Sequence, residues 1–355
     1  MPSTGRSSVW ARSGPLPYRR HVAGNPLLLL STVPDDLDRV EVALREAVRS
    51  EDPYLTEVAS HLIKAGGKRG RPAFAVGAAA TAAATMAPVP DDVISGAVSV
   101  ELVHLGSLYH DDVMDEATTR RTVESVNAKW GNLQAILAGD FLLARASEIA
   151  ASLGVEIAGL LAATIGRLCE GQVLELQHTY NPLRTEDVYL RSIEGKTASL
   201  YATASRIGAI VAGLPRDHVD ALTAFGLAYG MAFQIVDDIL DVVATDEQLG
   251  KPAGHDLIEG VYTLPVIRTL ANGEASGARL GELLGRVLSE DEMHEARALV
   301  RTNGGVGHAL DAARGFVDRA HAALEPLGAS EARAGLDGAA DHLLTSVSEI
   351  AAAAV

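Results

Sequence analysis

Cysteine is nearly absent from this chain of 355 residues, in which Cys169 is the only one. A single cysteine excludes an internal disulfide framework and fits a reducing compartment, so we expect a cytoplasmic protein. Aromatic residues are also scarce, at 4%, and alanine, leucine and valine supply most of the 48% hydrophobic content. This composition is ample for a buried core and favours helices over sheets.

Positive charge is scarce as well. The chain has 30 lysine and arginine residues against 46 aspartate and glutamate residues, a formal net charge of -16. Such a protein repels nucleic acid and anionic lipid, so we expect no nucleic-acid partner, and an anionic substrate must meet a local basic cluster. Residues 72–90 carry no charge but are mostly alanine between prolines, which predicts a buried helix and not a membrane span. A soluble protein is expected, which is compatible with peripheral association with a membrane.

No segment has a convincing alternating strand pattern, and helical periodicity dominates. Leu310, Ala313, Val317, Ala320 and Leu324 form one apolar stripe at alternating spacings of three and four. The sequence therefore predicts an all-α protein.

Helix boundaries are marked in two places. Ser289 with Glu292 has the pattern of a capping box, and Asp91 follows two prolines as the acidic start of a helix running towards Asp115.

Residues 1–34 contain four arginines and no acidic residue, and are rich in glycine, serine and proline, which predicts a disordered basic tail. Residues 35–355 are expected to form one helical domain.

Two D-D-x-x-D motifs are the strongest functional signal. On a helix, the first and last aspartates of such a motif share a face. Carboxylates without histidine or cysteine suit Mg²⁺, which keeps several waters and bridges substrate phosphates. One motif could be a solvated acidic face, but two motifs in apolar helical sequence would be costly to bury without a metal. The predicted metal-binding residues are Asp111, Asp112 and Asp115 in the first motif, and Asp237, Asp238 and Asp241 in the second.

Basic residues accompany these motifs. "GGKRGRP" is not a Walker P-loop, because it lacks the G-x-x-x-x-G-K-[ST] pattern and no strand precedes it. Any one of these residues could lie on a solvated surface, but as a set beside glycine turns they indicate diphosphate binding. The set comprises Lys68, Arg69, Arg71, Arg120, Arg121, Lys196 and Lys251.

The predicted combination of metals, cations and an apolar helical cavity suits the departure of a diphosphate from carbon. Metals and cations stabilise the leaving group, and a water-poor cavity shelters the carbocation. "GGKRGRP", "ELVHLGSLYHDDVMDEATTRR", "GKTASL", "FQIVDDILD" and "LGKPAGHDL" resemble, in this order, the motifs of the trans-isoprenyl diphosphate synthase (polyprenyl synthetase) family. The resemblance covers most of the chain, from about residue 66 to residue 265. It implies the isoprenoid synthase fold, an all-α bundle around a central cavity, with a homodimer as the usual assembly.

The resemblance also implies roles for single residues. Isopentenyl diphosphate and an allylic prenyl diphosphate would be the substrates, with three Mg²⁺ ions between the aspartate motifs in the family's usual arrangement. Metal would be ligated by Asp111, Asp115 and Asp237, with Asp112, Asp238 and Asp241 acting as ligands or through water. The allylic diphosphate would be held by Arg120, Lys196 and Lys251. Isopentenyl diphosphate would be held by Lys68, Arg71, His104 and Arg121, with Arg69 nearby. Thr197 and Gln234 would present oxygens to the developing cation, and Phe233 would line the site.

One departure from the family pattern concerns the segment "DLIEGVYTLP". The family often has lysine after this glycine, whereas this chain has Val261. One contact to the allylic diphosphate is therefore missing or supplied elsewhere.

Product length can be argued from side-chain size. The growing tail is expected to run along the helix upstream of Asp111, where Gly106 and Ser107 are small and leave the tunnel open. Tyr109 is expected to point elsewhere. We therefore predict a long-chain product, with a farnesyl- or geranylgeranyl-length product as the alternative.

Two rival functions are less well supported by the motifs. A class I terpene cyclase would not need the second diphosphate site, and a non-catalytic synthase subunit would be expected to lose one aspartate motif.

Overall fold

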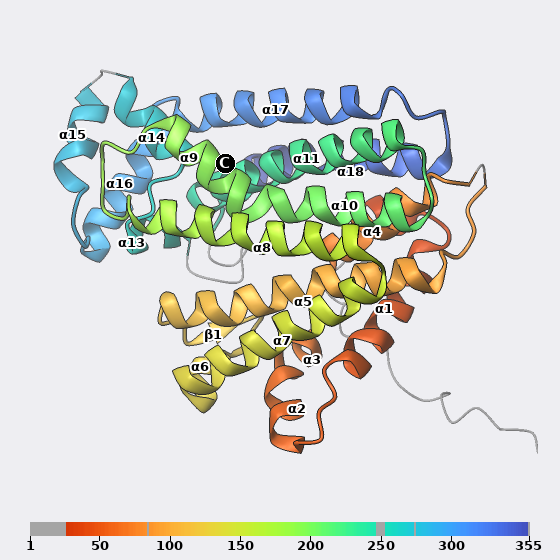
Figure 1. Cartoon of the computed structure of the whole chain (residues 1–355). Helices are drawn as coiled ribbons and strands as arrows, with labels where there is room; N and C mark the ends of the chain where they lie inside the picture. Colours follow the sequence, from red (N-terminus) through yellow and green to blue (C-terminus); the bar gives the residue numbers. More distant parts are fainter. Residues whose placement is uncertain (1–25, 84, 246–252, 273–274, 354–355) are drawn as a thin grey trace, which may run out of the picture.

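The computed structural model describes residues 26–83, 85–245, 253–272 and 275–353 (Figure 1). Within these residues the chain is almost entirely helical, which confirms the predicted all-α class. The only strands described are β1 (Thr119–Arg120) and β2 (Val123–Glu124), which form a short antiparallel hairpin. This hairpin follows the first aspartate motif directly.

The long helices lie in layers around one continuous apolar core (Figure 1). The helix α5 packs against α7, and α11 packs between α10 and α17. These central helices and their neighbours are α4 (Gly70–Ala80), α5 (Asp91–Met114), α7 (Asn132–Ser152), α8 (Val155–Leu176), α10 (Ser199–Val211), α11 (Arg216–Val243), α17 (Gly305–Leu324) and α18 (Glu331–Ala353).

The other helices described pack around these. They are η2 (Pro26–Leu29), α1 (Val33–Ala47), α2 (Pro53–Ala59), α3 (His61–Ala65), α6 (Val126–Trp130), α9 (Glu186–Ile193), α13 (His255–Glu259), α14 (Leu264–Ala271), α15 (Ala275–Leu283) and α16 (Glu290–Thr302). Between α9 and α10 lies η3 (Glu194–Ala198), a π-helical turn. Single π-helical turns are frequent at functional sites.

Several sequence-based boundaries are confirmed. The helix α5 begins at Asp91 after Pro90, and the capping box of Ser289 and Glu292 opens α16. Four members of the predicted apolar stripe on α17 are buried, while Leu310 is partly buried and packs against the core. The alanine-rich segment 72–90 is a buried helix only as far as Ala80, where a turn begins. Its residues fit the narrow space between α5 and α10 because most of them are alanine.

The predicted boundary at residue 34 is wrong. Leu27, Leu30 and Val33 are buried in the core, because η2 packs against α18. The side chain of Leu30 also approaches Gly335, where an added Cβ would overlap it. The domain therefore includes residues 26–34, and the rest of the predicted tail lies outside the described residues.

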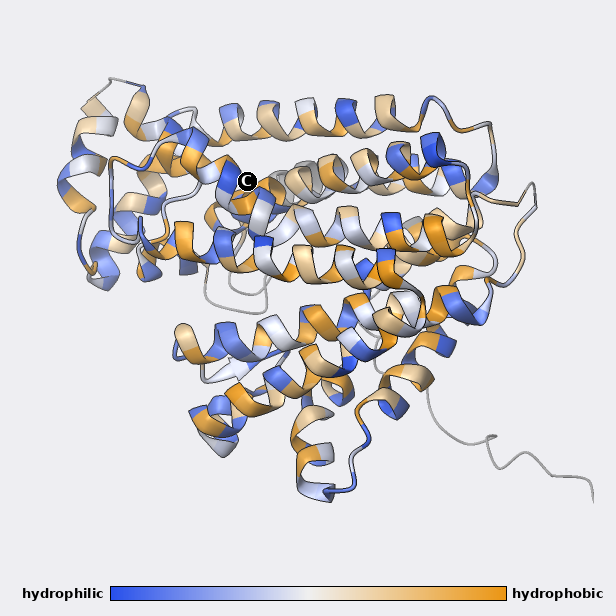
Figure 2. Cartoon of the chain, viewed as in Figure 1, coloured by the Kyte–Doolittle hydropathy of each residue, from blue (hydrophilic) through white to orange (hydrophobic). Residues whose placement is uncertain are grey.

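Two helices, α8 and α11, are long and apolar enough to cross a membrane by length and composition. Most of the apolar segment of α11 is buried inside the bundle, as expected for a core helix. Most of the corresponding segment of α8 is not buried. Figure 2 shows hydrophobic residues along α8, and most of its apolar segment is not covered by the rest of this chain.

Candidate active site

Both aspartate motifs lie at the C-terminal ends of long helices. The first motif ends α5, with Asp115 at its C-cap, and the second occupies the last two turns of α11. A helix C-terminus carries partial negative charge, so carboxylates there strengthen an already negative potential. The combination favours binding of cations.

In the first motif, Asp111 and Asp115 lie one above the other. The amide of Asp115 donates to the carbonyl of Asp111 at 2.8 Å, which continues the helical pattern through the motif. Burial raises the pKa of Asp111, while the positive charges of Lys196 and Arg120 oppose this effect. Partial burial and the charges of Glu259 and Asp111 raise the pKa of Asp115 to about 6. These two carboxylates share one face, as the spacing predicted.

Asp112 points elsewhere and is fully buried. Its Oδ1 accepts hydrogen bonds from Nε and Nη2 of Arg120, both at 2.6 Å. The side chain of Asn127 also donates to the Asp112 carbonyl at 2.9 Å. Asp112 Oδ1 therefore belongs to an ion pair that holds Arg120 in place, whereas its Oδ2 is buried with no hydrogen-bond partner among the described residues. The metal role of Asp112 stays a prediction.

The two adjacent arginines point in different directions because Arg120 ends β1 and Arg121 lies in the two-residue turn of the hairpin. Arg121 and Thr122 both have positive φ angles, 53° and 64°, as two-residue turns between antiparallel strands require. This conformation is unfavourable for a β-branched residue such as Thr122, and such strain tends to occur at functional sites. As a result, Arg120 turns towards Asp112 while Arg121 turns towards Gly66.

Arg121 lies against the turn formed by Gly66 and Gly67 before α4, which we call the glycine turn. Its Nη1 donates to the carbonyls of Leu62, at 3.1 Å, and of Gly66. Gly67 has a φ of 139°, which side chains rarely adopt, so glycine is favoured there, and its missing Cβ leaves room for the Arg121 guanidinium. Burial lowers the pKa of Arg121 to about 10, well above neutrality. Arg120 and Arg121 therefore lie in different parts of the site, as predicted for two substrates.

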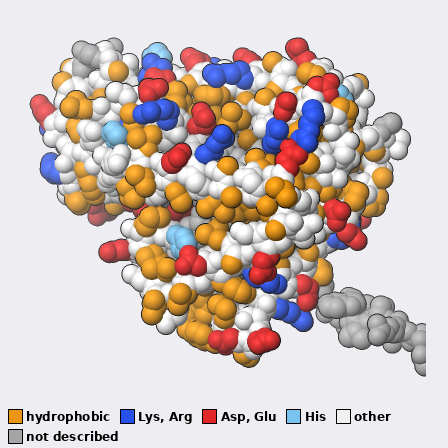
Figure 3. Space-filling view, in the orientation of Figure 1, with side chains coloured by type: hydrophobic (Ala, Val, Ile, Leu, Met, Phe, Trp, Pro, Cys, Tyr) orange, Lys and Arg blue, Asp and Glu red, His pale blue; other side chains and the backbone are white. Residues whose placement is uncertain are grey.

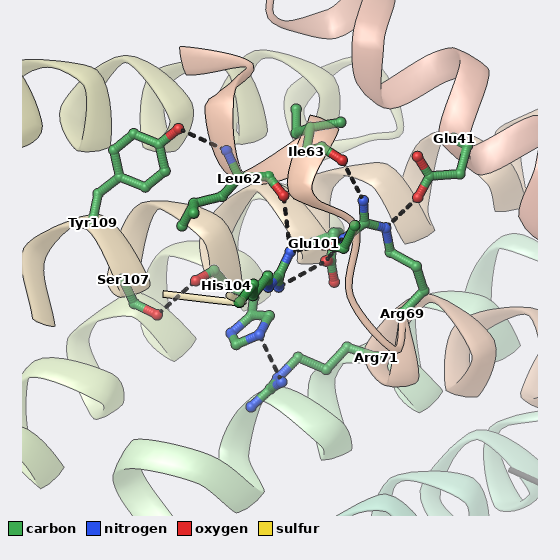
Figure 4. Close-up of polar contacts among 11 residues, drawn as sticks. Glu41, Leu62, Ile63, Arg69, Arg71, Glu101, His104, Ser107 and Tyr109 are labelled. Carbon is green, nitrogen blue, oxygen red and sulfur yellow. Dashed lines mark hydrogen bonds and ion pairs between the residues drawn. The ribbon is translucent and has the colours of Figure 1, made fainter. Parts of the chain in front are cut away.

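Arg69 does not lie at the substrate site, contrary to the prediction (Figure 4). It is 2% exposed and forms ion pairs with Glu41 and, at 3.0 Å, with Glu101. It also donates to the carbonyls of Gly66 and Ile63. Arg69 therefore joins α1, α5 and the glycine turn from inside the core, and leaves the neighbouring basic residues to face outwards.

Arg71 contacts His104 near the same turn (Figure 4). Arg71 Nη1 lies 3.1 Å from His104 Nε2, and its guanidinium lies 4.8 Å from the Tyr201 ring centre. Burial and the charge of Arg71 hold the pKa of His104 well below its usual range. A neutral His104 can accept a hydrogen bond from Arg71. Lys68, from the same "GGKRGRP" segment, is exposed. These residues and Arg121 are suitably placed for one diphosphate.

The second motif contributes a buried hydrogen-bond chain. Asp238 is 4% exposed and accepts hydrogen bonds from the Tyr189 hydroxyl at 2.5 Å and from Gln234 Nε2 at 2.9 Å. Gln234 Oε1 in turn accepts from the Thr197 hydroxyl at 2.7 Å. Burial raises the pKa of Asp238, and these donors oppose that effect. Asp238 therefore fixes the orientation of the Gln234 amide and, through it, of Thr197.

The other two aspartates of the motif differ in exposure. Asp237 is exposed, whereas Asp241 is buried and its Oδ2 accepts from the backbone N–H of Asp256 at 3.2 Å. Lys251 lies outside the described residues. The predicted cation Lys196 projects from η3 and pairs with Glu175 at 2.6 Å. Burial lowers the pKa of Lys196, but Glu175 and Asp111 outweigh it and the pKa is raised, so the ammonium is charged.

Phe233 lies in an aromatic group. Its ring centre lies 5.4 Å from that of Tyr201 and 6.2 Å from that of Tyr229, and Phe74 joins the same group. Such rings present polarisable faces that attract cations. Phe233 therefore belongs to an aromatic group of α4, α10 and α11, and its place in the substrate site stays a prediction.

One pocket joins the second motif to the cations. Several of its lining residues were not identified from the sequence, because single charged or aromatic residues in a helix or loop carry no motif. These residues are Glu175, Arg184, Tyr189, Asp256 and Glu259. The remaining lining residues include Lys196, Thr197, Gln234, Asp238 and Val261. Carboxylates and cations therefore line this pocket together, and two of them, Lys196 and Glu175, pair directly.

The residues present fit divalent cations that are completed by substrate. In the part of the chain that the structure describes, no three histidine, cysteine or acidic side chains form a complete cage for an ion. Mg²⁺ is commonly bound through one or two carboxylates, with waters and phosphate oxygens as the other ligands. Asp111 and Asp115 at the end of α5, and Asp237 near the end of α11, would supply such a partial donor set of oxygens.

Gly106 does not face this site. An added Cβ on Gly106 would lie 3.1 Å from the Gly139 carbonyl and 3.2 Å from Leu143, so glycine allows α5 and α7 to approach. The partly accessible stripe of α5 has helical spacing and comprises His104, Ser107, Leu108 and Asp111. The role predicted for Gly106 is therefore wrong, and Ser107 is the small residue on the accessible stripe. Tyr109 points away, as predicted: its hydroxyl donates to the Val58 carbonyl at 2.8 Å, and it accepts from the backbone N–H of Leu62 (Figure 4).

A polyprenyl synthetase family model matches residues 52–300. The chain belongs to this family. It is 41% identical to the nonaprenyl diphosphate synthase of Mycobacterium tuberculosis over 277 residues, which cover 77% of this chain and 81% of that protein. All the paired aspartates and cations described above lie within the matched region.

Solved structures of this family share the fold. A polyprenyl synthase from Caulobacter crescentus, complexed with calcium and isoprenyl diphosphate, has a TM-score of 0.84 and 35% identity, covering 91% of this chain and 98% of that one. A geranylgeranyl pyrophosphate synthase from Corynebacterium glutamicum, complexed with the same ligands, has a TM-score of 0.78 and 39% identity, covering 90% and 97%. The similar proteins thus make products of different lengths.

Proposed function

We propose that this polyprenyl synthetase condenses isopentenyl diphosphate with an allylic prenyl diphosphate in a Mg²⁺-dependent reaction, giving an all-trans polyprenyl diphosphate. The observation that carries the proposal is the separation of two cationic groups by one carboxylate-lined site. Arg120 and Lys196 lie near Asp111, whereas Arg71 and Arg121 lie near the neutral His104 at the glycine turn. One diphosphate suits each group.

Mg²⁺ ions, when bound, neutralise the allylic diphosphate and make it a better leaving group. The first and last aspartates of the first motif, with Asp237, are the residues that would hold them, and three ions per site is the expected number. Calcium in the two solved relatives supports a divalent cation bound with diphosphate.

The chain's own residues orient the substrates. Lys196 and Arg120 bind the allylic diphosphate, and Arg71, Arg121 and Lys68 bind isopentenyl diphosphate. The Thr197 hydroxyl donates to Gln234 and so directs its lone pairs away from that amide, where they stabilise a developing allylic cation. The aromatic face of Phe233 and the apolar surroundings exclude water from this cation. The proton lost after attack by the isopentenyl double bond passes to the released diphosphate.

A long-chain product is part of the proposal. The nonaprenyl diphosphate synthase relative and the small Ser107 on the accessible stripe of α5 support it. The geranylgeranyl-length relative makes the shorter product the outcome to test against.

We also propose a homodimer in the cytoplasm, formed through α7 and α8. Their apolar side chains are unusually exposed for a single chain, and Figure 3 shows hydrophobic side chains prominent over these helices. The exposed residues are Leu133, Ile136 and Leu137 on α7, and Val155, Val173 and Leu176 on α8. A second copy would cover this face, since apolar patches of this kind mark interfaces.

The direct test incubates the purified protein with Mg²⁺, radiolabelled isopentenyl diphosphate and allylic primers of several lengths, and separates the dephosphorylated products by chromatography. Mg²⁺-dependent incorporation into products longer than the primer is expected, and it should disappear when the metal is chelated. Cyclised hydrocarbon products, or no elongation of any primer, would overturn the proposal. Products that stop at the geranylgeranyl length would overturn only the long-chain assignment.

A further inference from the structure

Arg184 is a buried cation that the mechanism above does not use. It lies in the connection between α8 and α9 and is 4% exposed. Its Nη1 donates to the Tyr262 carbonyl at 3.2 Å, and its guanidinium lies 5.5 Å from the Tyr189 ring centre. Its Nε and Nη2 have no hydrogen-bond partner among the residues that the structure describes. Unpaired N–H groups on a buried charge are unfavourable, so the position indicates a ligand.

The pocket beside Arg184 is the one in which the allylic diphosphate is expected. Arg184 lines it together with Lys196, Thr197 and Gln234. Burial lowers the pKa of Arg184, and the negative charges of Glu175, Asp238 and Asp256 oppose this effect. Arginine stays protonated in proteins, so this side chain brings a full positive charge to the pocket wall.

Val261 lines the same pocket, at the position where the family often has lysine. The only protein hydrogen bond described for the Arg184 guanidinium goes to the carbonyl of the next residue, Tyr262. The guanidinium is thus anchored beside the side chain that lacks the expected charge. Its two remaining N–H groups have the fork geometry that matches phosphate oxygens.

We propose that Arg184 binds the diphosphate of the allylic substrate and supplies the positive charge that Val261 lacks. This inference rests on the proposed prenyltransferase function. A purely structural role would consist of tying the α8–α9 connection to residue 262 and packing on Tyr189. The two roles differ in whether a charge placed at residue 261 can replace Arg184.

The first variant is Arg184→Met, which keeps the apolar length of the side chain and removes the charge. The KM for the allylic primer should rise about tenfold or more, the effect of losing one charge-assisted hydrogen bond. The KM for isopentenyl diphosphate should stay within about twofold, because that substrate binds at the glycine turn. The matched control is Arg191→Met, since Arg191 is exposed on α9 and pairs with Asp187. It should leave both constants unchanged.

The second variant, Arg184→Met/Val261→Lys, decides between the two roles. The lysine should restore most of the lost primer affinity, whereas Val261→Lys alone should change it by less than about threefold, because the charge is already present. An unchanged primer KM in Arg184→Met, or a raised KM that lysine does not reduce, would overturn the inference. If Arg184→Met does not fold, Val261→Lys alone still tests the inference. A gain of about tenfold in primer affinity would overturn the inference, because it would show that the wild-type site lacks the positive charge assigned to Arg184.

Failure of the proposed function has a different signature. In that case the wild-type protein elongates no primer at all, and binding of inorganic diphosphate with Mg²⁺ is measured by calorimetry. Weaker binding to Arg184→Met than to wild type supports the anion site, and equal binding overturns it.

Discussion

The Asp112 carboxylate and the Arg120 guanidinium form an ion pair across the turn that follows α5, with Nη2 2.6 Å from Oδ1. Asp112 is fully buried, whereas the Arg120 side chain is 31% exposed and available to a substrate. The middle aspartate of a predicted metal-binding motif is therefore used to position a cation. This relationship makes the three aspartates of the motif unequal in a way that can be measured.

Asp112→Asn should release Arg120 while keeping the size of the buried side chain. The KM for the allylic primer should rise, and the free energy of unfolding should fall by about 1–3 kcal/mol, because one partner of a partly buried pair loses its charge. Steady-state kinetics and urea unfolding measure the two effects. Asp318→Asn, on the exposed side of α17, is the control and should change neither. A raised Mg²⁺ requirement with an unchanged primer KM would instead assign Asp112 to the metal.

Tyr189→Phe tests the hydrogen-bond chain behind the pocket. Its hydroxyl donates to Asp238 at 2.5 Å, and Asp238 orients Gln234. Removal of a hydrogen bond to a buried carboxylate should lower the free energy of unfolding by about 1.5–3 kcal/mol. The kcat should fall more than the KM for either substrate changes, because Thr197 and Gln234 act on the developing cation. Tyr54→Phe, at an exposed tyrosine of α2, should leave stability and kcat unchanged. A normal kcat in Tyr189→Phe would show that the chain is only structural.

Ser107→Phe tests the origin of product length. A phenyl ring on the accessible stripe of α5 should block the growing tail, so chromatography should show a shorter main product with the same primer. Gly106→Ala is the informative companion, because its Cβ would crowd the Gly139 carbonyl and Leu143. It should lower the melting temperature and leave the product length unchanged. The reverse pattern, a shorter product from Gly106→Ala alone, would contradict this placement of the tunnel.

The sequence was sufficient for features that depend on local periodicity. The spacing of Asp111 and Asp115, the capping box at Ser289 and the all-α class follow from helix geometry alone. Partners distant in sequence could not be inferred in this way. Arg69 and Arg71 are both arginines of the same segment, "GGKRGRP", and the sequence does not distinguish them. The backbone of Arg69 is left-handed where the chain enters α4, and its side chain turns inwards to Glu41 and Glu101.

The same limit explains Gly106 and Arg184. A small residue before an aspartate motif can serve either a tunnel or a close helix contact, and only the position of α7 decides between them. Arg184 lies in an irregular connection without a motif, and its partner Tyr262 is 78 residues away. Tertiary packing, which no local pattern encodes, gives both residues their roles.

Leu137→Glu tests the proposed dimer. Leu137 is 56% exposed in the single chain and lies within the apolar face of α7. A dimer interface would bury it, and an unpaired carboxylate there would be strongly unfavourable. Light scattering after size-exclusion chromatography should therefore give a dimer mass for the wild type and a monomer mass for the variant. Val287→Glu introduces the same charge at a 69% exposed valine between α15 and α16 and should remain dimeric. A wild-type monomer, or a dimer that persists in Leu137→Glu, would contradict the assignment of this face, because a buried glutamate and a stable apolar interface exclude one another at the same position.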